Sequence, residues 1–250
     1  MLSRYQQGGV KGSWRWSEVA VELYCGRCWR QANVRIDGIL TFVARGVSHK
    51  GAEDSRMKGC RPLTEVEVDL VQRSFGGAYA DRDRALFVLG VKSGFRISEL
   101  LSLRVGDVLQ HGRLVDRVTV RRQHMKNQRE GRTVLLHPEA KAALATWLSR
   151  LRQSPDCTAQ TFVFRSRKGQ NRPISAVQAW RILHEAVTTN ELTGKVGTHA
   201  MRKTFANRVY HQLNHDLVKT QRAMGHKNIN STVAYLSFIE DEIDAAILAS

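Results

Sequence analysis

The chain has 250 residues, of which 42% are hydrophobic and 25% charged, a length and composition that suit one large globular core. Lys and Arg outnumber Asp and Glu by 39 to 23, and the formal net charge of +16 favours a polyanionic partner, most simply nucleic acid, over a basic surface that serves only solubility. Because no apolar run approaches the ~20 residues of a membrane span and the N-terminus lacks the apolar core of a secretory signal, we expect no membrane association and a cytoplasmic, or in a bacterium nucleoid-associated, protein.

Residues 1–60 have the least regular pattern in the chain. Residues 17–31 and 35–43 are compatible with helices, and residues 44–59 have the composition of a linker. Tryptophans interleaved with arginines suit DNA, although tryptophans more often belong to a core. We therefore interpret residues 1–60 as a separate N-terminal region, with DNA clamping, partner binding and a disordered arm as the alternatives.

The four cysteines predict no metal site. In a cytoplasmic protein Cys25, Cys28, Cys60 and Cys157 are expected to be reduced thiols. Cys25 and Cys28 have the spacing of half a zinc site, but no second close pair matches them. We interpret these cysteines as partly buried structural residues, and we expect no metal ion and no cofactor.

The regular part of the chain begins at residue 61. Thr64, with acidic residues after it, is a typical helix N-cap, and Val66, Leu70 and Val71 have the spacing of an apolar helix face. Residues 81–94 predict a second, well-buried helix that stops at a glycine.

The pattern then changes from helix to strand and back. Residues 96–108 predict a short helix that ends near Arg104 or Gly106. Between residues 115 and 136 the apolar residues alternate on either side of a polar, basic centre, which predicts antiparallel strands joined by an exposed basic turn.

From Pro138 to the C-terminus the spacing is again helical. Cys157 and Trp180 are expected in the core. Five segments predict helices: 138–152, 174–187, 199–213, 217–225 and 231–238. The fold class expected is mainly α with a small antiparallel β-sheet.

Several chemically competent residues are scattered over these elements. Arg96 begins a helix, with Glu99 three residues later. His199 and Arg202 share one helix face, because residues at i and i+3 are neighbours on the cylinder. His226 and Tyr235 follow: "GHKNINSTVAYLSF" runs from Gly225 to Phe238. Cationic side chains and a phenol form a set that fits a phosphodiester.

Four blocks, taken in order, resemble the tyrosine recombinase or phage integrase family. The blocks are "GFRISELLSLRVGDV", "HMKNQREGRTVLL", "THAMRKTFANRVY" and "MGHKNINSTVAYLSF", and the resemblance covers residues 61–250. It implies a tyrosine recombinase-like catalytic domain over these residues, preceded by the short N-terminal region of residues 1–60.

The resemblance also implies a role for each matching residue. Arg96 and Arg202 would clamp the phosphate, Glu99 would support Arg96, and Tyr235 would be the nucleophile. His199 would accept the phenol proton. Two further residues complete the implied set: His226, donating to a non-bridging oxygen, and Lys126, the general acid for the leaving oxygen.

Two features qualify this transfer of roles. The chain has "HAMRKTFA" where the family usually shows "HDLRHTFA", so Ala200, Met201 and Lys203 depart from the common pattern without removing a reacting group. Lys126 has basic neighbours in the hairpin. The residues expected to contact DNA are Arg121, Arg122, Arg129 and Lys203.

The chemistry of such a site can be argued from general principles. A free phenol has a pKa near 10, so its ionisation at neutral pH costs roughly 4 kcal/mol. Arginine donates two parallel hydrogen bonds and keeps its charge, and each donor aimed at developing charge is worth about 3 to 4 kcal/mol. No metal is then required.

The expected function is a site-specific DNA recombinase or integrase that cuts and rejoins strands through a 3′-phosphotyrosyl intermediate without metal or ATP. The expected partners are double-stranded DNA and further copies of the chain, a homo-tetramer on DNA that forms from monomers. A type IB topoisomerase or telomere resolvase is the second hypothesis, and a non-enzymatic DNA-binding protein that retains the fold is the third. The apolar stripe in residues 239–250 fits docking on a neighbouring protomer or on its own domain equally well.

Overall fold

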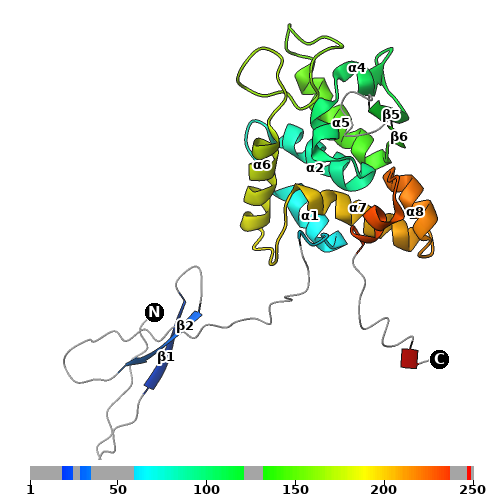
Figure 1. Ribbon diagram of the computed structural model, residues 1–250. Helices are drawn as coiled ribbons and strands as arrows, with labels where there is room; N and C mark the ends of the chain where they lie inside the picture. Colours follow the sequence, from blue (N-terminus) through cyan, green and yellow to red (C-terminus); the bar gives the residue numbers. More distant parts are fainter. Residues whose placement is uncertain (1–18, 25–28, 35–58, 121–131, 237–246, 249–250) are drawn as a thin grey trace, which may run out of the picture. The chain divides into compact units, whose positions relative to one another are not determined.

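The computed structural model describes residues 19–24, 29–34, 59–120, 132–236 and 247–248 (Figure 1). The chain divides into two compact units, Met1–Ser55 and Arg56–Ser250. The functions expected for residues 1–60 and 61–250 stay predictions.

The first unit contains a β-hairpin. Strands β1 (Val19–Tyr24) and β2 (Trp29–Val34) pair antiparallel. The helix expected over residues 17–31 is therefore wrong. Val19, Val21 and Leu23 alternate with the two-residue period of a strand, but Ala20 and Tyr24 are apolar too, and so short a run also fits a helix. The second expected helix, residues 35–43, lies outside the described residues.

The second unit begins with two helices whose ends match the sequence signals. Helix α1 (Glu65–Ser74) is capped by Thr64, whose hydroxyl accepts a hydrogen bond from the backbone N–H of Glu67 while the Glu67 carboxylate accepts one from the Thr64 N–H. Helix α2 (Ala80–Ser93) is largely buried and ends at Gly94, which adopts the left-handed conformation at φ 61°.

The face that α1 buries differs from the predicted one. Val68 and Val71 are buried, whereas Val66 and Leu70 are 70% and 43% exposed. The prediction is right only for Val71. Val68 and Val71 form an i, i+3 pair, and only the packing of α1 against α2 and α6 selects this pair over the neighbouring one.

The single short helix expected after Arg96 is two helices. Helix α3 (Ile97–Ser102) and helix α4 (Val105–Val108) are separated by extended residues. The break is stabilised at Arg104, whose backbone N–H donates to the Asp107 carboxylate.

The predicted strands are present. Within the described part of this unit, the strands form two antiparallel pairs, β3 (Leu109–Gln110) with β4 (Arg113–Leu114) and β5 (Arg117–Val120) with β6 (Arg132–Leu135). In the second pair Val120 lies opposite Arg132. This register brings Arg132 to the buried side of the pair.

The remaining elements are helical, so the mainly α fold with small antiparallel sheets is confirmed. The helices are α5 (Pro138–Leu151), α6 (Ala176–Thr189), α7 (Thr198–Gln212), α8 (Leu217–Met224) and α9 (Ile229–Val233). Helix α2 runs through the middle of the unit and packs against α5 and α7 (Figure 1). Tyr235, expected inside the last helix, lies in a turn after it.

Of the two residues expected in the core, one is partly buried and the other is exposed. Cys157 is partly buried against the core, as expected. Trp180 is 44% exposed, so its assignment to the core is wrong: α6 buries Ala179 and Leu183 and turns Trp180 outward. Its indole stacks on His184 at 4.7 Å and lines a cavity of about 590 Å³.

Two further findings concern the described residues only. None of the helices there combines the length and the apolar character that crossing a membrane requires. The same residues contain no group of three or more His, Cys, Asp or Glu side chains placed to hold a metal ion. Cys25 and Cys28 lie outside the described ranges.

Candidate active site

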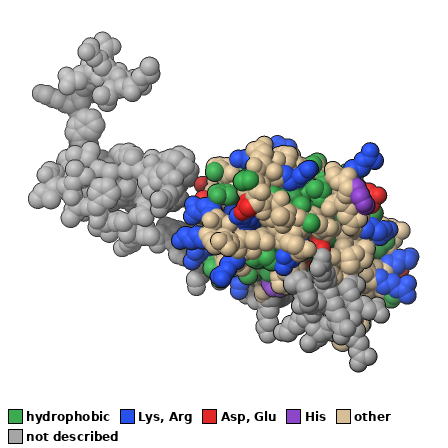
Figure 2. All heavy atoms as spheres, turned by 90° about the horizontal axis from the view of Figure 1, so that it is seen from above, with side chains coloured by type: hydrophobic (Ala, Val, Ile, Leu, Met, Phe, Trp, Pro, Cys, Tyr) green, Lys and Arg blue, Asp and Glu red, His purple; other side chains and the backbone are tan. Residues whose placement is uncertain are grey.

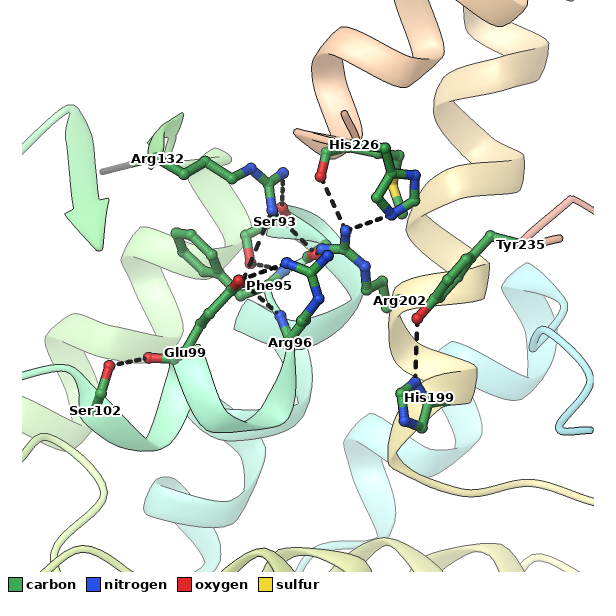
Figure 3. Close-up of polar contacts among 12 residues, drawn as sticks. Ser93, Phe95, Arg96, Glu99, Ser102, Arg132, His199, Arg202, His226 and Tyr235 are labelled. Carbon is green, nitrogen blue, oxygen red and sulfur yellow. Dashed lines mark hydrogen bonds and ion pairs between the residues drawn. The ribbon is translucent and has the colours of Figure 1, made fainter. Parts of the chain in front are cut away.

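The turn between α2 and α3 places Arg96. Gly94 is required there, because it has a positive φ and because a Cβ would overlap the ring of Phe205. The Arg96 guanidinium donates to Oε1 of Glu99 at 2.8 Å, and the Arg96 backbone N–H donates to Oε2 at 2.8 Å (Figure 3). Glu99 is buried, whereas Arg96 is only partly buried. The Glu99 carboxylate thus holds the Arg96 guanidinium in a position that still reaches solvent.

Helix α7 places His199 and Arg202 on one face, as the spacing predicts. Arg202 is 1% exposed. Its guanidinium donates through one nitrogen to the carbonyl of Gly94, and through the other to the carbonyl of Met224 at 2.9 Å and to Nε2 of His226 at 2.8 Å. Its Nε is buried and has no hydrogen-bond partner among the described residues. The guanidinium is thus held by the ends of α2 and α8 and by His226.

His226 follows the end of α8, where Gly225 takes the left-handed conformation at φ 63°. Burial, and then the charges of Arg202 and Arg96, lower the pKa of His226 from 6.5 to about 4. The ring is therefore neutral at neutral pH. Because a guanidinium can only donate, Nε2 accepts from Arg202, and Nδ1 carries the proton and donates to Oγ1 of Thr232 at 3.0 Å.

Tyr235 lies over these groups. Its hydroxyl is 3.3 Å from Nδ1 of His199, and the guanidinium carbon of Arg202 is 5.4 Å from the centre of its ring. The ring centres of Tyr235 and His226 are 5.3 Å apart. The small apolar cluster of Ala206, Met224 and Leu236 packs beside the phenol ring. Figure 3 shows Tyr235 and His199 pointing toward each other from different segments.

A third arginine, which the sequence analysis did not single out, joins the cluster. Arg132 is buried, and its guanidinium lies 4.0 Å from the Glu99 carboxylate and donates to the Gly94 carbonyl at 3.3 Å. A signal for it was available, because the two-residue period of a strand puts Arg132 on the same face as Val134, which packs against the core.

The cluster carries an excess of positive charge. Burial, and then the charge of Arg96, lower the pKa of Arg202 to about 10, while Glu99 opposes this shift. Arg202 stays protonated at neutral pH. Glu99 offsets only part of the charge of Arg96, Arg132 and Arg202, and the site is thus suited to an anion.

The basic residues of the hairpin lie outside the described part of the chain. Lys126, Arg121, Arg122 and Arg129 fall in the range 121–131, which the structure does not describe. Lys203 is half-buried on α7. The roles of these five residues stay predictions. On the face in Figure 2, Lys and Arg side chains are spread over the surface and interspersed with acidic ones.

Comparison with known proteins identifies relatives that match most of the second unit. The model of the phage integrase family matches residues 65–240. A probable integrase/recombinase of Bacillus subtilis, YoeC, is 31% identical over 165 residues, which are 66% of this chain and 82% of that protein. The tyrosine recombinase XerC of Caldanaerobacter subterraneus is 25% identical over 186 residues, 74% of this chain but 49% of the relative. The chain thus spans about half the length of this relative.

Solved structures have the same fold. The XerA recombinase matches with a TM-score of 0.62 at 22% identity, over 77% of this chain and 64% of that one. The XerH recombinase in a post-cleavage complex with a palindromic difH substrate matches with a TM-score of 0.61 at 24% identity, over 77% of this chain and 53% of that one. Because the family model covers most of the chain and YoeC is similar over most of its own length, the chain belongs to the phage integrase family of tyrosine recombinases.

Proposed function

We propose that the protein is a site-specific DNA recombinase that cuts and rejoins strands through a covalent bond between Tyr235 and a 3′-phosphate. One observation carries the proposal: the Tyr235 hydroxyl lies 3.3 Å from a histidine nitrogen of its own subunit, while its ring covers Arg202. The candidate nucleophile, proton acceptor and phosphate clamp therefore lie side by side, although they come from distant parts of the sequence.

The proposed step begins with a backbone phosphate held by Arg96 and Arg202. The phenol oxygen of Tyr235 attacks the phosphorus, and its proton passes to Nδ1 of His199. The new bond joins phosphorus to Tyr235, and the bond to the 5′-oxygen breaks. Lys126 is the candidate donor of the proton that the leaving oxygen takes up. Because the phosphotyrosine bond retains the energy of the phosphodiester, a 5′-hydroxyl can reverse the step without ATP.

Nε2 of His226 must gain a proton before it can donate a hydrogen bond to the phosphate. In the DNA-free protein its Nε2 accepts from Arg202, and its low pKa keeps the ring neutral. A phosphate bound beside the arginines offsets their charges, which raises the pKa of His226. We therefore propose that DNA binding favours the protonated form, which donates to a non-bridging oxygen.

DNA as the substrate follows from the same site together with the net charge of +16. Relatives of the chain are named recombinases, and one solved relative is a complex with its DNA substrate after cleavage. We extend the proposal to a homo-tetramer on DNA, since exchange between two duplexes requires the cutting of four strands.

The test uses a DNA duplex with a nick next to the scissile phosphate, so that a small fragment escapes and the covalent product accumulates. The duplexes come from a library of sequences, because the target site is unidentified. The parent protein should form an adduct that survives denaturing electrophoresis. Tyr235→Phe should form none and should still bind DNA. An undiminished adduct in this variant would show that another residue is the nucleophile.

Two further outcomes separate the alternatives. Binding without any adduct in the parent protein would favour a non-enzymatic DNA-binding protein. Adduct formation together with relaxation of supercoils, but without exchange between two duplexes, would favour a topoisomerase or a telomere resolvase. Exchange between two duplexes is the outcome expected here.

A further inference from the structure

Arg132 connects two helix ends that carry residues of the site. One guanidinium nitrogen donates to the Gly94 carbonyl at 3.3 Å, and the other donates to Ser93 at 3.3 Å and to Ala223 at 2.6 Å. Ser93 is the last residue of α2, and Ala223 lies in the last turn of α8. Arg96 follows the first of these ends in the sequence.

The bonded carbonyls lie at places where a helix cannot satisfy them itself. The last four carbonyls of a helix have no intrahelical partner, and the C-terminal end carries a partial negative charge. A buried guanidinium satisfies both needs, because it offers several donors and a positive charge. Arg132 thus caps α2 and α8 at the same time.

Arg202 contacts the same two ends, through the carbonyls of Gly94 and Met224. The two arginines differ in what else they contact. Arg202 also reaches His226 and lies under the ring of Tyr235, whereas Arg132 lies over the ring of Phe95 at 5.4 Å and near Glu99. Figure 3 shows Arg132 on the side of the cluster away from Tyr235.

The space that the Arg132 side chain occupies depends on the absence of a side chain at Gly225. A Cβ on Gly225 would lie 2.8 Å from Cδ and 3.0 Å from Nε of Arg132. Gly225 therefore serves two purposes, since its positive φ ends α8 and its missing side chain leaves room for the arginine.

We propose, resting on the function proposed above, that Arg132 is a positioning residue: it fastens the C-terminal ends of α2 and α8 and so sets the spacing of Arg96, Arg202 and His226. When a phosphate takes over the donors of Arg202, that arginine releases carbonyls of both helix ends. Arg132 remains bonded to both ends and keeps Arg96 and His226 in place. In this proposal Arg202 binds the phosphate, and Arg132 holds the ends of α2 and α8 in place.

The main experiment compares Arg132→Met, which keeps the length of the side chain and removes its donors and charge, with Arg132→Lys, which keeps the charge. Arg150→Met is the matched control, an exposed arginine near the end of α5 that pairs with Asp81. Cleavage of the nicked duplex is measured in a single turnover, and DNA affinity is measured separately. Arg132→Met should cleave about 100-fold more slowly at unchanged affinity, since small displacements of reacting groups cost this much. Arg132→Lys should recover part of the rate, and Arg150→Met should match the parent.

Cleavage at the parental rate in Arg132→Met would overturn the proposal. So would parallel losses of cleavage and affinity, because these would make Arg132 a DNA-binding residue. If circular dichroism shows that Arg132→Met does not fold, Arg132→Lys replaces it in the comparison. Cleavage at the parental rate in Arg132→Lys would then overturn the proposal.

A second variant tests the coupling. Gly225→Ala should push on the Arg132 side chain and slow cleavage. If both substitutions act through the same contact, the loss in the double variant with Arg132→Met should be smaller than the product of the single losses. Losses that multiply fully would show that Gly225 and Arg132 act independently, against the proposal.

A measurement on the DNA-free protein tests the role of Arg132 independently of the proposed function. Arg132→Met should speed amide hydrogen exchange in the last turns of both α2 and α8, whereas Arg150→Met should not. Unchanged exchange at either end would overturn the double cap. A parent protein that forms no adduct would refute the recombinase function, and the exchange result would still decide the role of Arg132.

Discussion

The hydroxyl of Tyr235 lies 3.3 Å from Nδ1 of His199, and the two residues reach this distance from different elements. His199 stands in the first turn of α7, whereas Tyr235 lies in the turn that follows α9. The pairing therefore depends on how the segment from α8 to Leu236 packs on α7. The candidate proton acceptor therefore lies beside the phenol in the DNA-free protein.

This relationship leads to the first prediction. His199→Gln removes the acceptor nitrogen and should slow adduct formation by roughly 10²- to 10⁴-fold, the usual contribution of a positioned acid or base. DNA affinity should stay close to that of the parent. His184→Gln, an exposed histidine on α6, is the control. Adduct formation at the parental rate in His199→Gln would exclude His199 as the acceptor.

The second prediction concerns the shape of Arg202. Arg202→Lys keeps a positive charge but cannot reach the Gly94 and Met224 carbonyls and His226 together, as the guanidinium does. Cleavage should fall by about 10²- to 10³-fold, as when one donor to a developing charge is removed. Arg208→Lys makes the same change further along α7, where Arg208 pairs with Glu65, and should cleave normally. Equal losses in both variants would contradict a specific clamp.

The third prediction concerns stability. The buried Glu99 carboxylate accepts hydrogen bonds from Arg96 and lies 4.0 Å from Arg132. Glu99→Gln leaves buried positive charge uncompensated and should lower the free energy of unfolding by about 3 to 5 kcal/mol. Asp116→Asn removes an exposed partner of Lys141 and should change the free energy of unfolding far less. Urea unfolding measures both, and similar small losses would mean that Glu99 does not stabilise the arginines.

The fourth prediction follows from the pKa of His226, which is lowered from 6.5 to about 4 in the folded protein. Between these values the unfolded chain binds a proton at His226 and the folded chain does not. The contribution to stability is thus complete above pH 6.5 and is lost as the pH falls toward 4. Lowering the pH over this range should reduce the Tm of the parent more than that of His226→Gln, while His184→Gln should follow the parent. Parallel curves for the parent and His226→Gln would contradict the shift.

Much of the local structure could be predicted from single residues. Thr64 caps α1, and Gly94 and Gly225 end α2 and α8, because a helix end needs a partner for its free groups or a residue that accepts positive φ. His199 and Arg202 share a face because of helical geometry alone. The family resemblance singled out five candidate reacting residues that the structure brings together, namely Arg96, His199, Arg202, His226 and Tyr235.

Other features could not be predicted from local patterns. Val68 replaces Val66 on the buried face of α1, and Trp180 faces outward, because either face of a helix with mixed apolar residues can be buried until its neighbours are in place. Strands β1 and β2 lie where residues 17–31 predict a helix, since short apolar runs fit both periods.

The sequence by itself determined the family, the helical fold class, the positive charge and the candidate reacting side chains, since each depends on residue types and short spacings. Only the tertiary structure decided that Arg132 caps two helix ends, that Arg202 is buried under Tyr235, and that the pKa of His226 is low. These properties arise between segments that are far apart in the chain, and burial and charge at such contacts depend on the packing of all of them together.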